Sequence, residues 1–319
     1  MKKRYILVLI VALLAIGGGA FAWFQWREAR QTRALKAANE MGAIIDVQEA
    51  VQGKPVTLTF VKGTLSGEQL ARLQDVGNLT TLNLIETKVG DDAVPALKLL
   101  PDLRALDLAG TQVTDAGLSQ LPALRELSLR NTAVTDAGLE ALARQNDLHS
   151  LNLAGTKVTD AGMKRLTQRF RSLMLDNTAV GDAGLAHLDL TNLEVLGLAN
   201  TKVTDEFLQR LQAATGLVQL NLENTAATEN GLKCLQKLSK LKSLNLRGTK
   251  SGDANMPYIG SMTDLTMLSL ANTPLTDEGL PPLKNLGNLR YLNLKDTKIT
   301  DKRFEEIRMS LLPSIRVDR

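Results

Sequence analysis

The sequence predicts an α/β solenoid with a curved parallel sheet on its concave face and short helices on its convex face, after an N-terminal apolar helix. Three observations predict this fold class. A unit of 21 to 24 residues recurs ten times, each unit places leucines first at period two and then at helical spacing, and a long apolar stretch opens the chain. Repetition at a fixed period is the sequence signature of a stack of similar coils.

Residues 1–26 have the pattern of a signal peptide or a transmembrane anchor. A positively charged start is followed by an apolar stretch from Tyr5 to Trp26, which is long enough to span a hydrocarbon core of ~30 Å. Ala20-Phe21-Ala22 fits the small-x-small pattern that signal peptidase accepts, so cleavage and retention both stay open. Either outcome predicts an exported chain, which faces the periplasm or exterior if membrane-anchored and is secreted if cleaved.

Residues 27–55 are predicted to form a linker helix and an N-terminal cap. Leu35 and Ala38 fall on one face of a helix over residues 28–41. Two short apolar stretches within residues 44–56 flank a glycine, a pattern that predicts a hairpin.

The leucine-rich solenoid is predicted to span residues 56–319. Its repeat follows the pattern L-x-x-L-x-L-x-x-T-x-V-T-D-x-G-L-x-x-L. One threonine marks the same place in every full repeat: Thr87, Thr111, Thr132, Thr156, Thr178, Thr201, Thr225, Thr249, Thr273 and Thr297. A divergent first coil over residues 58–73 and a last strand over residues 312–317 would cover the two ends of the stack and shield its core.

Each part of the repeat has a predicted place in the coil. The x-L-x-L-x segment predicts a short strand with two buried leucines, such as Leu151 and Leu153. We expect the marker threonine at the corner, where its hydroxyl can satisfy backbone groups of its own and adjacent coils. The next Thr-Asp pair, such as Thr159-Asp160, predicts a helix start, with the threonine as N-cap and the carboxylate near the positive helix end.

The T-x-V-T-D-x-G-L-x-x-L signature resembles a group of bacterial leucine-rich-repeat proteins over about four fifths of the chain. It is also similar in pattern to the cysteine-containing repeats of F-box substrate receptors, with threonine at the corner in place of cysteine. The resemblance implies a solenoid that serves as a recognition scaffold. Residues 27–55 do not supply the additional helical segment of an F-box, so an F-box-like substrate receptor is a distant alternative.

The charge composition argues against a nucleic-acid partner. The chain has 38 lysines and arginines and 34 aspartates and glutamates, and without Lys2, Lys3 and Arg4 the basic count falls to 35, one above the acidic count. No basic cluster alternates with aromatic residues, as a groove for single-stranded nucleic acid requires.

The sequence offers little chemistry, and we expect no enzyme activity, no cofactor and no metal. His149 and His187 are the only histidines, stand in different repeats and are expected at the solvated surface, and Cys234 is the only cysteine. Motifs of metalloproteases, serine hydrolases and nucleotide-binding loops are absent. Helix capping explains the recurring aspartates better than calcium, which needs several oxygens at one point. These aspartates are Asp92, Asp115, Asp136, Asp160, Asp182, Asp205, Asp277 and Asp301.

Two surfaces are candidates for a partner. The longer side chains at outward positions of the concave strands predict a protein or peptide site: Glu126, Arg130, Asp176, Glu223, Arg247, Tyr291 and Lys295. The position after the corner threonine carries a lysine stripe: Lys88, Lys157, Lys202, Lys250 and Lys298. The leading hypothesis is an extracytoplasmic binding or scaffolding protein. The alternative is an envelope structural protein that contacts anionic polymer or lipid through the lysine stripe, and a solvated charged edge is the plainer explanation of that stripe.

Overall fold

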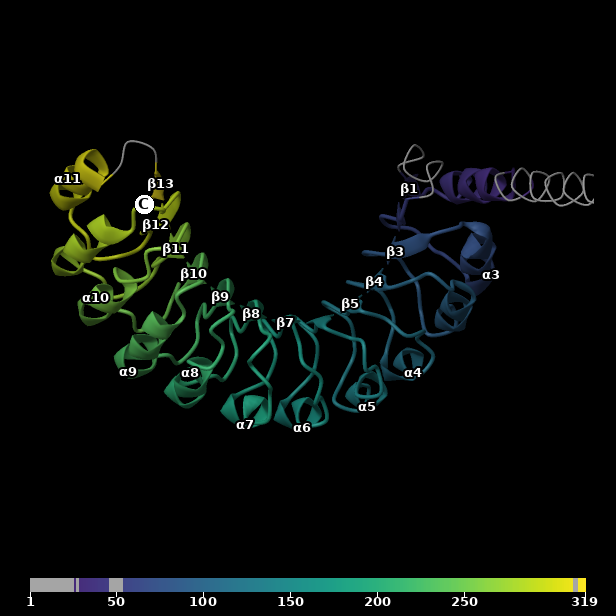
Figure 1. The fold of residues 1–319 in the computed structure, drawn as a ribbon, viewed down its shortest axis with the longest axis horizontal. Helices are drawn as coiled ribbons and strands as arrows, with labels where there is room; N and C mark the ends of the chain where they lie inside the picture. The colour runs from purple at the N-terminus through teal and green to yellow at the C-terminus, as the bar shows by residue number, and fades with distance from the viewer. Residues whose placement is uncertain (1–25, 27–28, 46–53, 312–314) are drawn as a thin grey trace, which may run out of the picture.

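The computed structural model describes residues 26, 29–45, 54–311 and 315–319. Over these residues the chain forms a horseshoe, with the sheet along its concave face and the helices along its convex face (Figure 1). Each coil runs from a strand through a corner to a helix, and we name each coil by its corner threonine. The predicted leucine-rich solenoid is confirmed.

In the described part of the chain the sheet has 13 strands, which follow one another in chain order. The first two strands are antiparallel and every later pair is parallel. The strands are β1 (Ile44–Ile45), β2 (Val56–Thr59), β3 (Leu79–Asn83), β4 (Ala105–Asp107), β5 (Glu126–Ser128), β6 (Ser150–Asn152), β7 (Ser172–Met174), β8 (Val195–Gly197), β9 (Gln219–Asn221), β10 (Ser243–Asn245), β11 (Met267–Ser269), β12 (Tyr291–Asn293) and β13 (Arg316–Asp318).

The convex face is built from short helices, several of them a single turn. The α-helices are α3 (Gly67–Ala71), α4 (Asp115–Leu118), α5 (Leu139–Leu142), α6 (Asp160–Met163), α7 (Asp182–Leu185), α8 (Asp205–Leu211), α9 (Glu229–Leu232), α10 (Met256–Ile259) and α11 (Asp301–Leu311). The 3-10 helices are η1 (Arg72–Asp75), η2 (Val94–Leu99), η3 (Lys233–Lys237), η4 (Asp253–Asn255), η5 (Asp277–Gly279) and η6 (Pro281–Asn285).

The two leucines of each strand segment point into one continuous core, as the alternating pattern predicts. Leu151 and Leu153 are 1% and 0% exposed, whereas Asn152 between them is only half-buried on the concave face. The register places Leu127, Leu151 and Leu173 side by side on β5, β6 and β7. Equivalent leucines therefore stack from coil to coil, and the whole stack forms a single core.

Nine of the ten corner threonines are buried and Thr297 is half-buried, and their hydroxyls donate only within their own coil. In the Thr156 coil the hydroxyl donates to the carbonyl of Leu153 at 2.6 Å, and each of the ten corner threonines makes the same bond to the residue three before it. The residue before the threonine has a positive φ, 71° at Gly155 and 55° at Asn131, which explains the glycine or asparagine in eight of the ten coils. Glu86 and Asp296 hold the position in the other two. The expected bonds from corner threonines to adjacent coils are not formed.

The aspartate at the helix start makes the bond between coils instead. Thr159 caps α6 as predicted, accepting from Ala161 N. Its own N–H and hydroxyl donate to the Asp136 carboxylate of the preceding coil, at 2.7 and 2.6 Å. We expected the carboxylate to stabilise the start of its own helix. This prediction was incomplete, because the carboxylate also bonds the next coil. The first member of the series is Asp91, which binds Thr114, and the assignment to exposed Asp92 was wrong by one residue.

These aspartate–threonine pairs form what we call the edge ladder, and the ladder explains the glycine of T-D-x-G. A Cβ added to Gly162 would lie 2.3 Å from Oδ1 of Asp136, so in this coil glycine gives the carboxylate of the coil below its room. The same close approach recurs at Gly117, Gly138, Gly184, Gly231 and Gly279. Phe207 and Arg303 hold the equivalent position in two other coils, where the ladder bonds are also formed. In the last pair the hydroxyl of Thr300 is the main cause that lowers the pKa of Asp277.

The N-terminal end of the stack is covered by a helix and a hairpin. The helix over residues 29–40 buries Leu35 and Ala38 in the solenoid core, so it is a cap and not a free linker. β1 pairs with β2 as the predicted hairpin requires, and Leu58 continues the leucine stack into the divergent first coil.

The C-terminal end is covered by α11 and β13, and β13 confirms part of the predicted last strand. The predicted apolar N-terminal segment, residues 1–26, and its cleavage site lie outside the described residues except for Trp26. Within the described ranges, no helix combines the length and apolar character needed to cross a membrane.

Candidate functional site

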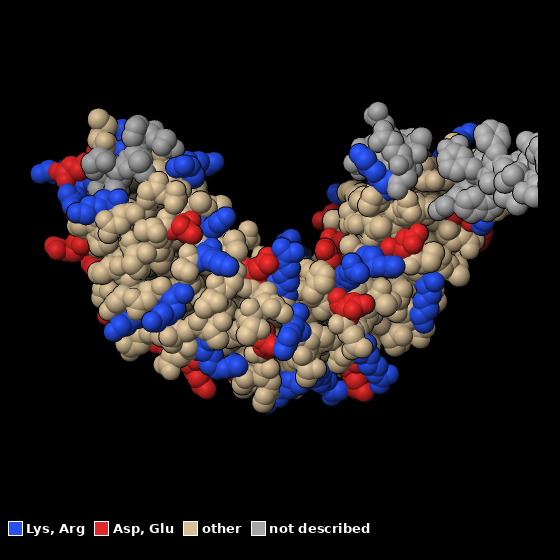
Figure 2. Space-filling model, viewed as in Figure 1, with Lys and Arg blue, Asp and Glu red and all other residues tan. Residues whose placement is uncertain are grey.

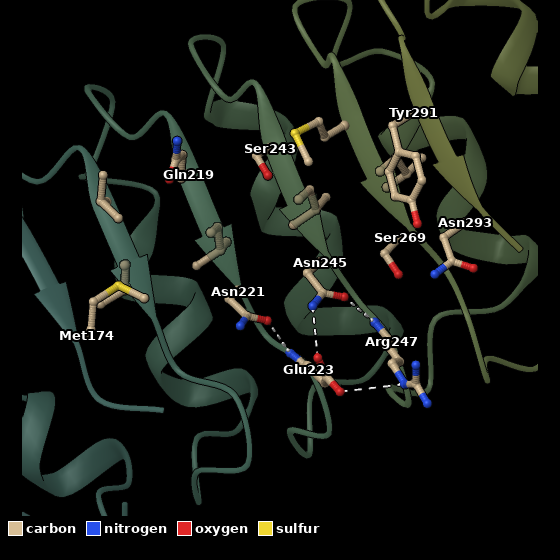
Figure 3. Close-up of a pocket in the computed structure, with 16 residues that line it drawn as sticks. Met174, Gln219, Asn221, Glu223, Ser243, Asn245, Arg247, Ser269, Tyr291 and Asn293 are labelled. Carbon is tan, nitrogen blue, oxygen red and sulfur yellow. Dashed lines mark hydrogen bonds and ion pairs between the residues drawn. The ribbon is translucent and has the colours of Figure 1, made fainter. Parts of the chain in front are cut away.

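The concave face is hollowed between β7 and β12 (Figure 3). This concave hollow has a volume of about 400 Å³ and receives side chains from all six strands. It is lined by Met174, Val195, Leu196, Gln219, Leu220, Asn221, Glu223, Ser243, Leu244, Asn245, Arg247, Met267, Leu268, Ser269, Tyr291 and Asn293. Apolar side chains, amides, hydroxyls and one charged pair thus share one surface, a mixture typical of macromolecular interfaces.

The amides on the floor of the concave hollow are held in fixed orientations. Oδ1 of Asn221, Asn245 and Asn293 each accepts the backbone N–H two residues later, at 3.1, 3.0 and 3.1 Å. Nδ2 of Asn221 and of Asn245 in turn donates to Asp176 and to Glu223, each at 3.0 Å. These two amides are therefore held at both their oxygen and their nitrogen, so a partner that contacts them does not have to order them, which lowers the entropy cost of binding.

Glu223 links two neighbouring coils across the concave hollow (Figure 3). Its carboxylate accepts from Nδ2 of Asn245 at 3.0 Å and pairs with Nε of Arg247 at 3.6 Å. We call this group the concave clasp: Glu223, Asn245 and Arg247. The Glu223 and Arg247 side chains are 29% and 47% exposed, so solvent screens their attraction and a partner can still reach both.

Asp176 is a predicted site residue that the structure buries. Its side chain is 8% exposed and fills the space above Gly197, where an added Cβ would lie 2.1 Å from Oδ2. Its Oδ1 accepts from Ala199 N at 2.9 Å and from Asn221 Nδ2 at 3.0 Å. Burial is the main cause that raises the pKa of Asp176, against the opposing effect of these hydrogen bonds. Asp176 therefore does not line the concave hollow but holds one of its lining residues, Asn221, in place.

Asp176→Asn is expected to make the free energy of unfolding less dependent on pH. The pKa of Asp176 is raised in the folded state from an ordinary value of 3.8, so its contribution to stability is fully present below that value. The contribution is lost as the pH rises through the higher folded-state pKa. Asparagine does not titrate and keeps an acceptor for Ala199 N.

The difference in unfolding free energy, wild type minus Asp176→Asn, should therefore fall between about pH 3 and neutral pH. Urea unfolding of both proteins across this range measures it. A difference that is constant or rises with pH contradicts the assignment.

Tyr291 and Met267 supply the apolar part of the concave hollow at its C-terminal end. The Tyr291 hydroxyl donates to Asp318 at 2.9 Å, and burial together with this bond raises the pKa of Tyr291. Tyr291 therefore also ties β12 to the terminal strand. Met267 is 49% exposed, which is unusual for an apolar side chain on a strand.

The structure divides the predicted concave residues into separate groups. Three of them line the concave hollow: Glu223, Arg247 and Tyr291. Glu126 is exposed at the start of β5, Arg130 is exposed just after β5, and Lys295 is exposed just after β12; none of these three lines the hollow. Sequence reasoning did not select Met267, although a methionine at an outward strand position was a signal that could have identified it.

The predicted lysine stripe is exposed at all five positions. From Lys157 onward it occupies alternate coils, since Ala179, Ala226 and Pro274 hold the same position in the coils between. The edge ladder aspartates follow three residues later on the same edge, so acidic side chains accompany the lysines. Figure 2 shows basic and acidic side chains interspersed on the face in view, without an extended patch of one sign.

The histidines and the cysteine form no reactive group with one another. His187 is exposed as expected, but His149 is half-buried and its Nδ1 is shielded without a hydrogen-bond partner, so full solvation of His149 was wrong. Cys234 is partly exposed and its thiol lies 3.7 Å from the Asn230 carbonyl. Within the described ranges no three His, Cys, Asp or Glu side chains converge as metal ligands would.

Comparisons with known proteins agree with the repeat and the fold. A family model described as Leucine Rich repeat matches residues 100–121, 120–143 and 145–166. Among solved structures, an internalin (inlF) of Listeria monocytogenes is similar with a TM-score of 0.56 and 22% identity, covering 82% of this chain and 86% of that one. At this identity the likeness shows the fold alone. The chain therefore carries leucine-rich repeats in a solenoid.

Two further structures are similar at lower scores. A leucine-rich-repeat protein of Leptospira interrogans has a TM-score of 0.44 and 20% identity, covering 80% of this chain and 81% of that one. Internalin C2 of Listeria monocytogenes has a TM-score of 0.44 and 23% identity, covering 74% and 84%. A comparison with curated protein sequences found no match, and the similarity to F-box receptors has no counterpart among these matches.

Proposed function

We propose that this chain is an extracytoplasmic leucine-rich-repeat protein that binds a protein or peptide partner in the concave hollow. It acts as a binding or scaffolding module and not as an enzyme. The observation that carries the proposal is the concave hollow itself, where exposed Met267, oriented amides and the half-exposed Glu223–Arg247 pair meet on one sheet. Leucine-rich repeats commonly bind proteins, which is consistent with this use.

The size of the concave hollow suits a macromolecular partner. Six strands about 4.8 Å apart extend over roughly 24 Å along the solenoid. A specific protein interface buries roughly 800 Å² on each partner and concentrates its energy in a few central side chains, often Trp, Tyr, Arg or Met. Arg247, Met267 and Tyr291 supply three such side chains within the hollow.

The export pattern of residues 1–26 supports a place outside the cytoplasm, with a membrane anchor if the segment is retained. Alkaline phosphatase fused after residue 55 would then be active in a bacterial host. An inactive fusion at normal protein levels would place the repeats in the cytosol and contradict this part of the proposal.

The combined substitution Arg247→Glu and Met267→Glu is expected to weaken partner binding by at least about tenfold. It reverses one charge and places a second carboxylate on the apolar part of the concave hollow. Both side chains are exposed, so folding should be preserved. The partner is first captured by a photo-cross-linker at position 219 in native membranes, and the affinity of the purified partner is then measured by titration.

Arg130→Glu is the matched control, because Arg130 is an exposed arginine of the same sheet outside the concave hollow. We expect the affinity of the Arg130→Glu variant for the partner to stay within about twofold of the wild-type value. Equal losses in both variants would indicate a general charge effect, and no loss in either variant would move the site away from the hollow.

A further inference from the structure

The edge ladder is interrupted at one junction between coils. Seven of the nine junctions among the ten full coils, all within the described part of the chain, carry both aspartate–threonine bonds. One more keeps the bond to the backbone N–H, from Gly181 to Asp160. Between the Thr225 and Thr249 coils, Glu229 replaces the aspartate and Gly252 replaces the threonine, and neither bond is formed there.

The interior of the same junction is also poorly matched. The position filled by valine in most coils holds Ala227 and Ser251, and Asn255 stands where six of the other nine full coils have the ladder glycine. Ser251 and Asn255 are 0% and 1% exposed, yet Ser251 Oγ and Asn255 Oδ1 have no hydrogen-bond partner. Asn255 Nδ2 replaces the lost ladder bonds with one bond to the Glu229 carbonyl at 3.1 Å. Buried polar atoms without partners destabilise the packing around them.

The backbone bond along the edge is longer at this junction than at the others that form it. In the other described coils with this bond, the N–H after the corner threonine donates to the preceding coil at 2.8 to 3.2 Å, and Pro274 in the next coil has no N–H to donate. At Lys250 the corresponding distance to the Ala227 carbonyl is 3.4 Å. A longer bond of this kind is weaker.

The concave side of the junction is held more firmly. β9 and β10 keep full parallel pairing, and the concave clasp joins Glu223 of the Thr225 coil to Asn245 and Arg247 of the Thr249 coil. The two coils are therefore tied along the concave sheet and loose along the edge. Such an arrangement permits rotation about the sheet more easily than separation of the coils.

We propose that the junction between the Thr225 and Thr249 coils is a hinge that sets the opening of the horseshoe, with the concave clasp as its latch. The arm from Ser243 onward then moves against the arm that ends with the Thr225 coil. The concave hollow has lining residues on both arms, so hinge rotation changes its width. The hinge belongs to the free protein and does not depend on which partner the hollow binds.

Hydrogen exchange of the full-length protein tests the hinge without a partner. Peptides that cover residues 249–256 should exchange about tenfold faster, or more, than the equivalent peptides over residues 156–163 and 201–208. Amide exchange reports local opening, which is governed by the weakest contacts around each amide. Equal protection in all three peptides would overturn the proposal.

A restored variant tests the cause. Glu229→Asp, Gly252→Thr and Asn255→Gly together rebuild the repeat consensus at the junction. A Cβ at Gly252 would meet only Pro274 Cγ, at an ordinary 3.6 Å, and the backbone there is extended at φ −113°. Exchange over residues 249–256 should slow to the rate of the equivalent peptides. Unchanged fast exchange in a folded restored protein would overturn the assignment of the hinge to the missing ladder bonds.

Arg247→Gln tests the latch. This test does not depend on whether the restored variant folds. Loss of the ion pair to Glu223 should speed exchange over residues 249–256 by about threefold and leave residues 156–163 unchanged. Arg130→Gln, which removes an exposed arginine that has no ion pair within the described residues, is the matched control and should change neither peptide. Identical effects of both substitutions would overturn the latch.

Discussion

Leu151→Ala is expected to lower the free energy of unfolding by about 2 to 5 kcal/mol, the cost of truncating a buried leucine. Leu151 is 1% exposed and stacks between Leu127 and Leu173 of the neighbouring coils. The loss therefore removes packing on both sides of one coil. Urea unfolding followed by circular dichroism measures the change.

Asn152→Ala is the neighbouring control and should cost only about 0.5 to 1.5 kcal/mol. Asn152 is half-buried on the concave face, and its Oδ1 accepts from Ala154 N at 3.0 Å. Its truncation removes one hydrogen bond and no core contact. Equal costs for the two substitutions would mean that the inward and outward positions of the strands are assigned wrongly.

Gly162→Ala is expected to lower the free energy of unfolding by about 2 to 4 kcal/mol, although it adds a single methyl group to a helix. The new Cβ would lie 2.3 Å from Oδ1 and 3.0 Å from Cα of Asp136. Asp136 must then shift, which strains both of its bonds to Thr159. Overpacking and weakened charge-assisted hydrogen bonds both contribute.

A double-mutant cycle separates these causes. Asp136→Ala alone should cost about 1 to 3 kcal/mol, and the double variant should cost clearly less than the sum of the two single changes, because the alanine leaves space for the new methyl group. Gly287→Ala is the control, since nothing lies within 4 Å of a Cβ there, and it should change stability by no more than about 0.5 kcal/mol. Additive costs at residues 136 and 162 would contradict the steric account of the glycine.

Much of the fold could be predicted because the features that define each coil lie within a few residues of one another in the sequence. The strand phase of Leu151 and Leu153 follows from alternation alone. The corner threonine bonds a carbonyl three residues earlier, and Thr159 caps a helix that starts at the next residue. Bonds of such short range depend on local backbone geometry, which the sequence pattern reveals directly.

The candidate site could be predicted only in part, because the residue type at an outward position does not indicate which side chains of other coils lie next to it. Arg247 and Tyr291 were selected as residue types that anchor interfaces, and both line the concave hollow. Asp176 was selected as one of the longer side chains at outward strand positions. It is buried because Gly197 of the next coil leaves the space that it fills.

By itself the sequence determined the solenoid, the inward and outward faces of its strands and the absence of known catalytic motifs. Only the tertiary structure decided which coil each aspartate serves, since Asp136 and Thr159 are 23 residues apart and meet through the stacking register. It also decided that the concave residues gather between β7 and β12 and that one junction lacks its ladder. The physical reason is that a repeat fixes contacts within a coil, whereas contacts between coils depend on the side chains that two successive coils place opposite each other.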